Sequence, residues 1–228
     1  FYAKYSIDVD FVGHPLLDMI HSLPPNDPAK FYKENSLPDK PLIALLPGSR
    51  KQEIKKMLSV MLGVIPNFPE YQFVIAGAPS IEKEFYDSII QETPVVLLQG
   101  RTHALLSNAY AALVTSGTAT LETALFEVPE VVCYKSSFIS YQIAKRVIDH
   151  SVIKFISLVN LIMDKEVVKE LIQKELTVNN LSKELLSITQ NKDFREKQIK
   201  EYKLLKEKLG GGGASDKSAD LILNFFNS

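Results

Sequence analysis

The segment VTSGTATLETAL, residues 114–125, places a run of small residues where an apolar strand gives way to a helix. The first amides of a helix have no partner within the helix, and the helix dipole adds positive potential there. Small side chains would let a phosphate approach these amides closely, and here they belong to Ser116, Gly117, Thr118, Ala119 and Thr120. The segment therefore predicts an anion site, while simple N-capping by Ser116 or Thr118 stays open as the alternative.

A carboxylate follows one turn further along the same expected helix. Glu122 lies about 7 Å along the axis from the helix start, at a rise of about 1.5 Å per residue. That offset suits the step from a diphosphate to an attached ribose, and a carboxylate can accept hydrogen bonds from two vicinal hydroxyls. We expect Glu122 to hold a ribose, although an acid near a helix start is also favourable without a ligand.

A second strand-to-helix turn, LLPGSRKQEI at residues 45–54, has the same character. Ser49 and Gln52 fit a capping box, which would be purely structural. Arg50 and Lys51 do not fit that interpretation, because each cation at a helix start opposes the dipole by about 0.3–1 kcal/mol. An anion held nearby would reverse the sign of this effect.

Other chemistry-bearing residues give weaker signals. His103 follows an apolar run within GRTHALL and could line a base pocket, whereas His14 in GHP is predicted to be structural. The histidines lack metal-ligand spacing, and the Asp8–Asp10 pair precedes an expected strand, so we interpret it as a solvated turn. The glycine-rich patterns of dinucleotide and P-loop sites are absent from the sequence.

Composition narrows the class of protein. A net charge of -1 gives no general attraction to nucleic acid, and the one cysteine, Cys133, suits a reducing compartment. No apolar stretch approaches the roughly 20 residues that span a bilayer. Because the sequence opens on Phe1, we interpret it as a fragment or a processed half of a longer chain.

Apolar runs of strand length alternate with segments of helical length. Strands are expected at 42–46, 72–76, 95–98, 111–114 and 130–134, and helices at 50–65, 81–91, 102–109 and 117–127. This alternation predicts an α/β fold with a doubly wound, Rossmann-like parallel sheet, whose ligands bind beyond the carboxyl ends of the strands. After about residue 165 only helices are expected, at 166–173, 179–188, 192–209 and 215–227.

The combination of motifs resembles one family. FVGHPLLD (11–18), LLPGSRKQEI, VTSGTATLETAL and SLVNLI followed by KELIQKE (157–175) occur in the order found in lipid-A-disaccharide synthase, an inverting glycosyltransferase of the two-domain GT-B fold. That family transfers 2,3-diacylglucosamine from UDP to 2,3-diacylglucosamine 1-phosphate, giving a β-1,6-linked disaccharide and UDP. The resemblance implies that this chain is the C-terminal, donor-binding half. The resemblance divides the chain into four parts: a remnant of the N-terminal acceptor domain (1–18), a linker (19–41), the donor domain (42–209), and a glycine hinge with a final helix (210–228). The remnant would include the last strand of the acceptor domain, near residues 9–12.

The resemblance also implies roles for individual residues. Arg50 and the helix start at 116–120 would stabilise the departing diphosphate without a metal or other cofactor. Ser49, next to Arg50, would belong to the same binding site. The loop that holds Arg101 and His103 would contact uracil through its backbone. Asn160 and Gln173 match family positions near the sugar and the diphosphate. No carboxylate here matches the catalytic base, which is expected in the acceptor domain.

Partners follow from the same resemblance. The substrates would be UDP-diacylglucosamine and acylated glucosamine 1-phosphate, handled in the cytoplasm at the inner membrane face. A basic amphipathic helix at 192–208 and the stretch 138–148 could contact the membrane, although packing of that helix on the domain is favoured. The Gly210–Gly213 hinge would permit a homodimer that exchanges C-terminal helices.

Three alternatives stay open. The chain could be a non-catalytic UDP-sugar-binding module that needs a separate acceptor-domain partner. It could belong to a related UDP-N-acetylglucosamine glycosyltransferase, the peptidoglycan enzyme being nearest. A UDP-sugar epimerase shares the fold, but the sequence offers no convincing acid/base pair for it.

Overall fold

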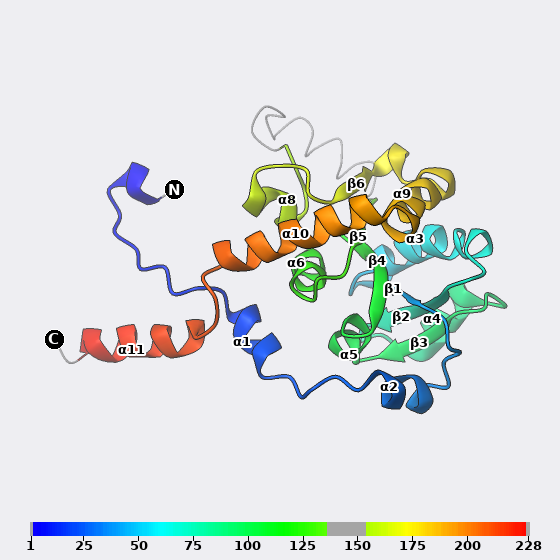
Figure 1. The fold of residues 1–228 in the computed structure, drawn as a ribbon, viewed down its shortest axis with the longest axis horizontal. Coiled ribbons are helices and arrows are strands. Elements are labelled where there is room, and N and C mark those ends of the chain that lie inside the picture. Colours follow the sequence, from blue (N-terminus) through cyan, green and yellow to red (C-terminus); the bar gives the residue numbers. More distant parts are fainter. Residues whose placement is uncertain (1, 136–153, 227–228) are drawn as a thin grey trace.

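The structure is a computed structural model that describes residues 2–135 and 154–226. Six parallel strands form one sheet in the order β3-β2-β1-β4-β5-β6 (Figure 1). The strands are β1 (Leu42–Leu46), β2 (Gln72–Gly77), β3 (Val96–Gln99), β4 (Ala109–Thr115), β5 (Glu130–Tyr134) and β6 (Lys169–Ile172). The strand order reverses direction between β1 and β4, which is the position where such sheets bind ligands.

Helices cover both faces of the sheet (Figure 1). They are α1 (Pro15–His21), α2 (Pro28–Glu34), α3 (Lys51–Leu62), α4 (Lys83–Ile90), α5 (Thr102–Leu106), α6 (Thr118–Leu125), α8 (Leu158–Met163), α9 (Val178–Gln190), α10 (Lys192–Lys208) and α11 (Ala214–Phe226), with short 3-10 turns at Tyr2–Tyr5, Ile65–Asn67 and Gln173–Glu175. Ile43 and Leu45 of β1 pack toward α3, α4 and α9, whereas Leu42, Ala44 and Leu46 face α2 and α5. All five residues of β1 are buried, as expected for a strand covered on both faces.

The five strands predicted from apolar runs are confirmed, but the end of the sheet differs from the prediction. A helix at 166–173 is wrong, because Lys169–Ile172 pair in parallel with β5 as β6. The strand near 9–12 is also wrong, since that segment has no regular structure and Phe11 is 71% exposed. The sixth strand, β6, therefore lies beside β5 and is the last strand on that side of the sheet.

The region predicted as a linker carries a packed helix. Asp27 caps α2, its carboxylate accepting a hydrogen bond from the amide of Lys30 at 3.0 Å. Phe31 of α2 is buried against the sheet. His14 likewise caps α1 through its ring nitrogen, at 3.2 Å from the amide of Leu16, so it is structural as predicted.

Helix α10 lies on the domain with its apolar face inward (Figure 1). Tyr202 and Leu205 are completely buried in a cluster with residues of α6 and α8. The favoured prediction, that this helix packs on the domain, is confirmed, and the alternative fails because protein covers the face that would enter lipid. The other candidate stretch, 138–148, lies outside the described residues. Among the residues that the structure describes, no helix is long and apolar enough to cross a bilayer.

The N-terminal segment and α11 meet beside α1 (Figure 1). Asp18 of α1 accepts hydrogen bonds from the amides of Gly213, Ala214 and Ser215, which caps α11. These contacts lower the pKa of Asp18 to about 2, the hydrogen bonds from Ser215 contributing most. The predicted hinge is thus folded against α1.

Large apolar side chains remain exposed at this end of the molecule. They are Tyr2, Tyr5, Ile7, Val9 and Phe11 in the N-terminal segment, and Leu221, Ile222, Leu223, Phe225 and Phe226 in α11. By contrast, Cys133 in β5 is fully buried, and burial raises the pKa of its thiol.

Candidate functional site

The two turns predicted to hold an anion lie at neighbouring positions on the sheet. Leu46, the last residue of β1, pairs with Val114 of β4, so residues 47–50 and 115–118 leave the same edge from adjacent strands. The two helices that follow cover opposite faces, α3 packing with the Ile43 side of β1 and α6 with the opposite face of the sheet. The turns therefore flank the point where the strand order reverses.

The start of α6 has no side-chain cap. Its N-cap residue is Gly117, with φ 156° and ψ -163°, a backbone region that is essentially reserved for glycine. A Cβ at this position would meet no atom within 4 Å, so the space in front of the helix is open. The amides of Thr118 and Ala119 have no acceptor within the described part of the chain. The alternative in which Ser116 or Thr118 caps the helix is thus not found.

The hydroxyls around this helix start hold the turn in place. Ser116 Oγ donates to the carbonyl of Ile156 at 2.9 Å, and the Ser116 amide donates to the carbonyl of Cys133 at 3.1 Å. Thr120 Oγ1 donates to the carbonyl of Gly117 at 2.8 Å. These groups fix the backbone, which leaves the amides of Thr118 and Ala119 as the donors free for an anion.

Glu122 and His103, predicted separately, come together in space. His103 Nε2 of α5 lies 3.6 Å from Glu122 Oε2 of α6, and the two side chains are 38% and 21% exposed. The His103 ring stacks on Phe126, with centroids 5.9 Å apart and planes at 20°. A carboxylate and an aromatic ring therefore lie one turn behind the open helix start, within reach of solvent.

The two cations that begin α3 have different surroundings. Arg50 is the N-cap residue and is exposed, and its guanidinium makes no hydrogen bond or ion pair with the residues that the structure describes. Lys51 turns away to Glu82, with Nζ 2.7 Å from Oε2, and lies over the ring of Phe85. The hydrogen bond from Lys51 lowers the pKa of Glu82. Only Arg50 therefore offers an unpaired charge here.

The predicted capping box at Ser49 and Gln52 is wrong by one residue. The helix begins at Lys51, and Glu53 Oε2 accepts a hydrogen bond from the Ser49 amide at 3.1 Å. The turn needs glycine at position 48, since φ is +106° and a Cβ would lie 2.2 Å from the Glu53 carboxylate. The exposed Ser49 side chain is left at the same edge as Arg50.

Arg101 points away from the candidate site. Its guanidinium lies 3.0 Å from Asn35 Oδ1 and 3.3 Å from Glu34 Oε2, both at the end of α2. The backbone of the loop, which is the part expected to contact uracil, remains at the carboxyl end of β3.

Asn160 is completely buried and its amide is fully used by the protein. It donates to the carbonyl of Val168 and to Glu170, both at 2.8 Å, and accepts from the amides of Val167 and Val168 at 2.7 and 2.9 Å. A side-chain amide offers two donors and two acceptor positions, so none remains for a ligand. In this structure Asn160 therefore positions its neighbours.

Gln173 directly follows β6 at the same edge of the sheet, with φ 53°. A left-handed backbone at a residue other than glycine costs about 1–3 kcal/mol, and such residues cluster at functional sites. The role of Gln173 near a ligand stays a prediction.

A family model described as "Lipid-A-disaccharide synthetase" matches residues 1–222. The chain is 37% identical to the lipid-A-disaccharide synthase of Syntrophus aciditrophicus and 34% identical to that of Gloeothece citriformis, over 97% and 99% of its length. The chain belongs to the lipid-A-disaccharide synthase family. It spans 59% and 60% of the lengths of these two relatives.

Solved structures confirm the fold of this family member. The chain is similar to the UDP-GlcNAc 2-epimerase from Neisseria meningitidis bound to UDP-GlcNAc, with a TM-score of 0.60, 15% identity, and coverage of 97% of this chain and 58% of that one. It is also similar to WaaG, a glycosyltransferase involved in lipopolysaccharide biosynthesis, with a TM-score of 0.56, 13% identity, and coverage of 92% and 54%. At these identities the likeness establishes the α/β architecture alone.

Two residues next to the candidate site were missed in the sequence. Glu170 binds the backbone of residues 156–157, and Thr115, at the end of β4, has a buried hydroxyl without a partner in the described chain. Glu170 was missed because its segment was predicted as a helix. The β-branched Thr115 looked like the end of an apolar strand.

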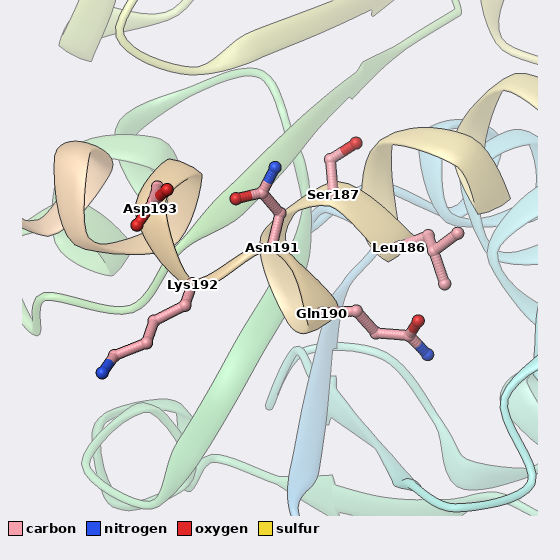
Figure 2. A pocket seen from close by; sticks show the side chains of 6 residues that line it. All are labelled: Leu186, Ser187, Gln190, Asn191, Lys192 and Asp193. Atoms are coloured by element: carbon pink, nitrogen blue, oxygen red, sulfur yellow. The ribbon is translucent and has the colours of Figure 1, made fainter.

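One hollow on the surface lies away from the candidate site. It measures about 490 Å³ and is lined by residues of the α9–α10 junction, which Figure 2 shows as Leu186, Ser187, Gln190, Asn191, Lys192 and Asp193. Tyr110, near the start of β4, donates to the carbonyl of Thr189 beside this junction. The hollow is therefore at the opposite end of β4 from Ser116.

Among the described residues, no group of three or more His, Cys, Asp or Glu side chains is placed to hold a metal.

Proposed function

We propose that this chain is the donor-binding half of a lipid-A-disaccharide synthase. The intact enzyme would transfer 2,3-diacylglucosamine from UDP to 2,3-diacylglucosamine 1-phosphate, forming the β-1,6 disaccharide and releasing UDP. The observation that carries the proposal is the uncapped start of α6 with the Glu122–His103 pair one turn behind it. Family membership supports the reaction class.

Each group has a role in this reaction. The free amides of Thr118 and Ala119 would bind the diphosphate, and Arg50 would stabilise the negative charge that grows on it as the glycosidic bond breaks. Glu122 would accept hydrogen bonds from the ribose hydroxyls, and His103 with its loop would lie against uracil. With these groups the leaving diphosphate needs no metal ion.

The acceptor site and the catalytic base belong, in this proposal, to the part of the relatives that this chain does not span. The chain alone would then bind UDP without transferring sugar. The exposed apolar side chains of α11 and the N-terminal segment are available for that missing acceptor domain, or for a second copy that exchanges α11.

Because both substrates carry acyl chains, we also place the intact enzyme in the cytoplasm, in peripheral contact with the inner membrane face. Flotation with anionic liposomes tests this placement, and an enzyme that stays entirely unbound contradicts it.

Calorimetry with UDP and with inorganic diphosphate tests the nucleotide site. We expect the chain to bind UDP, and Glu122→Ala to weaken UDP binding about tenfold through loss of the ribose contacts while diphosphate binding stays unchanged. Glu127→Ala is a matched control, because Glu127 follows α6 and pairs with Lys206. An equal loss for both ligands would show that Glu122 does not contact ribose, and a chain that does not bind UDP would refute the proposed function.

A further inference from the structure

One carboxylate ties three segments together behind the start of α6. Glu170, in β6, accepts hydrogen bonds from the amides of Ile156 and Ser157, both at 2.9 Å, and from the Ser157 hydroxyl at 2.7 Å. Asn160 adds a fourth donor at 2.8 Å. The carboxylate is thus fixed by four donors from the stretch that leads into α8.

This stretch in turn contacts the α6 turn. The carbonyl of Ile156 accepts the hydrogen bond from Ser116 Oγ at 2.9 Å. Ser116 also donates through its amide to Cys133, the residue of β5 that pairs with Leu171 of β6. The turn at 116–118 is therefore held from β5 and, through Ile156 and Glu170, from β6.

Ser116 is held through both its hydroxyl and its amide, at the residue before the turn whose amides, those of Thr118 and Ala119, have no acceptor among the described residues. A binding group that is held by its neighbours loses less entropy when the ligand arrives.

We propose that Glu170 is a positioning residue for the anion-binding turn, acting through Ile156 and Ser116 without touching the ligand. This inference rests on the proposed function. In this inference Glu170, a charged residue outside the candidate site, aligns the amides that would bind the diphosphate.

The first test is a double-mutant cycle on UDP affinity, measured by calorimetry. Glu170→Gln keeps the shape of the side chain but loses acceptor capacity, and we expect it to weaken UDP binding about tenfold. Ser116→Ala should have a similar effect, and the double variant should be no weaker than the stronger single variant. The matched control is Glu166→Gln, since exposed Glu166 contacts only Lys169 among the residues described. Effects that multiply, or an affinity of Glu170→Gln within twofold of wild type, would overturn the proposal.

The second test needs no ligand. Hydrogen exchange of the free protein should become faster in peptides covering residues 116–121 in Glu170→Gln but not in Glu166→Gln, while peptides covering β1 and β2 stay unchanged. A general loss of stability would instead accelerate exchange throughout the sheet, and that result would contradict a positioning role. If the wild-type chain does not bind UDP, the proposed function fails, and exchange at 116–121 alone decides the role of Glu170.

A milder variant covers the case in which Glu170→Gln does not fold. Ser157→Ala removes one donor to Glu170 and the cap of α8. It should change UDP affinity and local exchange in the same direction by a smaller factor. No change in either measurement would overturn the proposal.

Discussion

At the scale of single residues, the start of α3 separates two cations that are adjacent in the sequence. Lys51 is neutralised by Glu82, whereas Arg50 has no partner among the residues described and lies beside the α6 turn on the neighbouring strand. An unpaired cation at a helix N-cap is unfavourable in the free protein, since it opposes the dipole. The cost is offset once an anion binds, so Arg50 is the better candidate for a role in the reaction.

We expect Arg50→Ala to lower the turnover of the intact enzyme at least about 100-fold, because charge on the leaving group loses its stabilising partner. Lys51→Ala is the matched control and should keep turnover within threefold of wild type. Steady-state assays with the UDP-sugar donor measure both. Turnover of Arg50→Ala within threefold of wild type would remove Arg50 from the mechanism.

The place of a single residue could be predicted from the sequence only where the course of the backbone decides that place. The uncapped turn before α6 could be predicted from the sequence because small residues between a strand and a helix are informative by themselves, and its binding of an anion stays a prediction. The direction of a long side chain was not visible, so the pairing of Lys51 with Glu82 and of Arg101 with Glu34 could not be predicted. The place of Asn160 near the sugar was expected from the family resemblance alone, and its complete burial could not be seen in its local sequence.

At the scale of elements, apolar continuity identified the strands that are buried on both faces, such as β1. It failed for β6, where Lys169 and Glu170 interrupt the apolar pattern and favour a helix locally. Pairing with β5 overrides that local preference. Helix α10 shows the complementary case, in which both the apolar face and the packing favoured from the sequence are found in the structure.

The burial of α10 leads to a prediction about stability. Leu205 is fully buried, so Leu205→Ala should lower the free energy of unfolding by about 2–5 kcal/mol through lost contacts and a cavity. The neighbouring Leu204 is 42% exposed, and Leu204→Ala should change the free energy by less than about 1 kcal/mol. Urea denaturation followed by circular dichroism measures both. Equal effects would mean that α10 does not pack as described.

At the scale of the whole molecule, the N-terminal segment and α11 leave the domain at the same place beside α1, and the two ends of the chain then lie apart (Figure 1). Asp18 connects the two segments, because its carboxylate binds the first amides of α11. The exposed apolar side chains also gather there, in α11 and the N-terminal segment. A partner that covers one of these segments would therefore lie close to the other.

The Asp18 contact predicts a pH dependence. The pKa of Asp18 is lowered from 3.8 to about 2, so its contribution to holding α11 is complete above pH 3.8 and is lost as the pH falls through about 2. In NMR spectra, the amide resonances of Gly213 and Ser215 should titrate with a midpoint near pH 2. Asp18→Asn should abolish this titration. A midpoint near 3.8 would show that the carboxylate does not cap the helix in solution.

The burial of Cys133 also allows site-specific labelling with a fluorescent dye. Its thiol is the only one in the sequence, and it is enclosed in the sheet and held in the protonated state. A maleimide dye should therefore leave the native chain unlabelled. A cysteine introduced at exposed Lys51, whose replacement is expected to leave turnover nearly unchanged, would then carry the dye alone, so its fluorescence could follow the arrival of a nucleotide in real time.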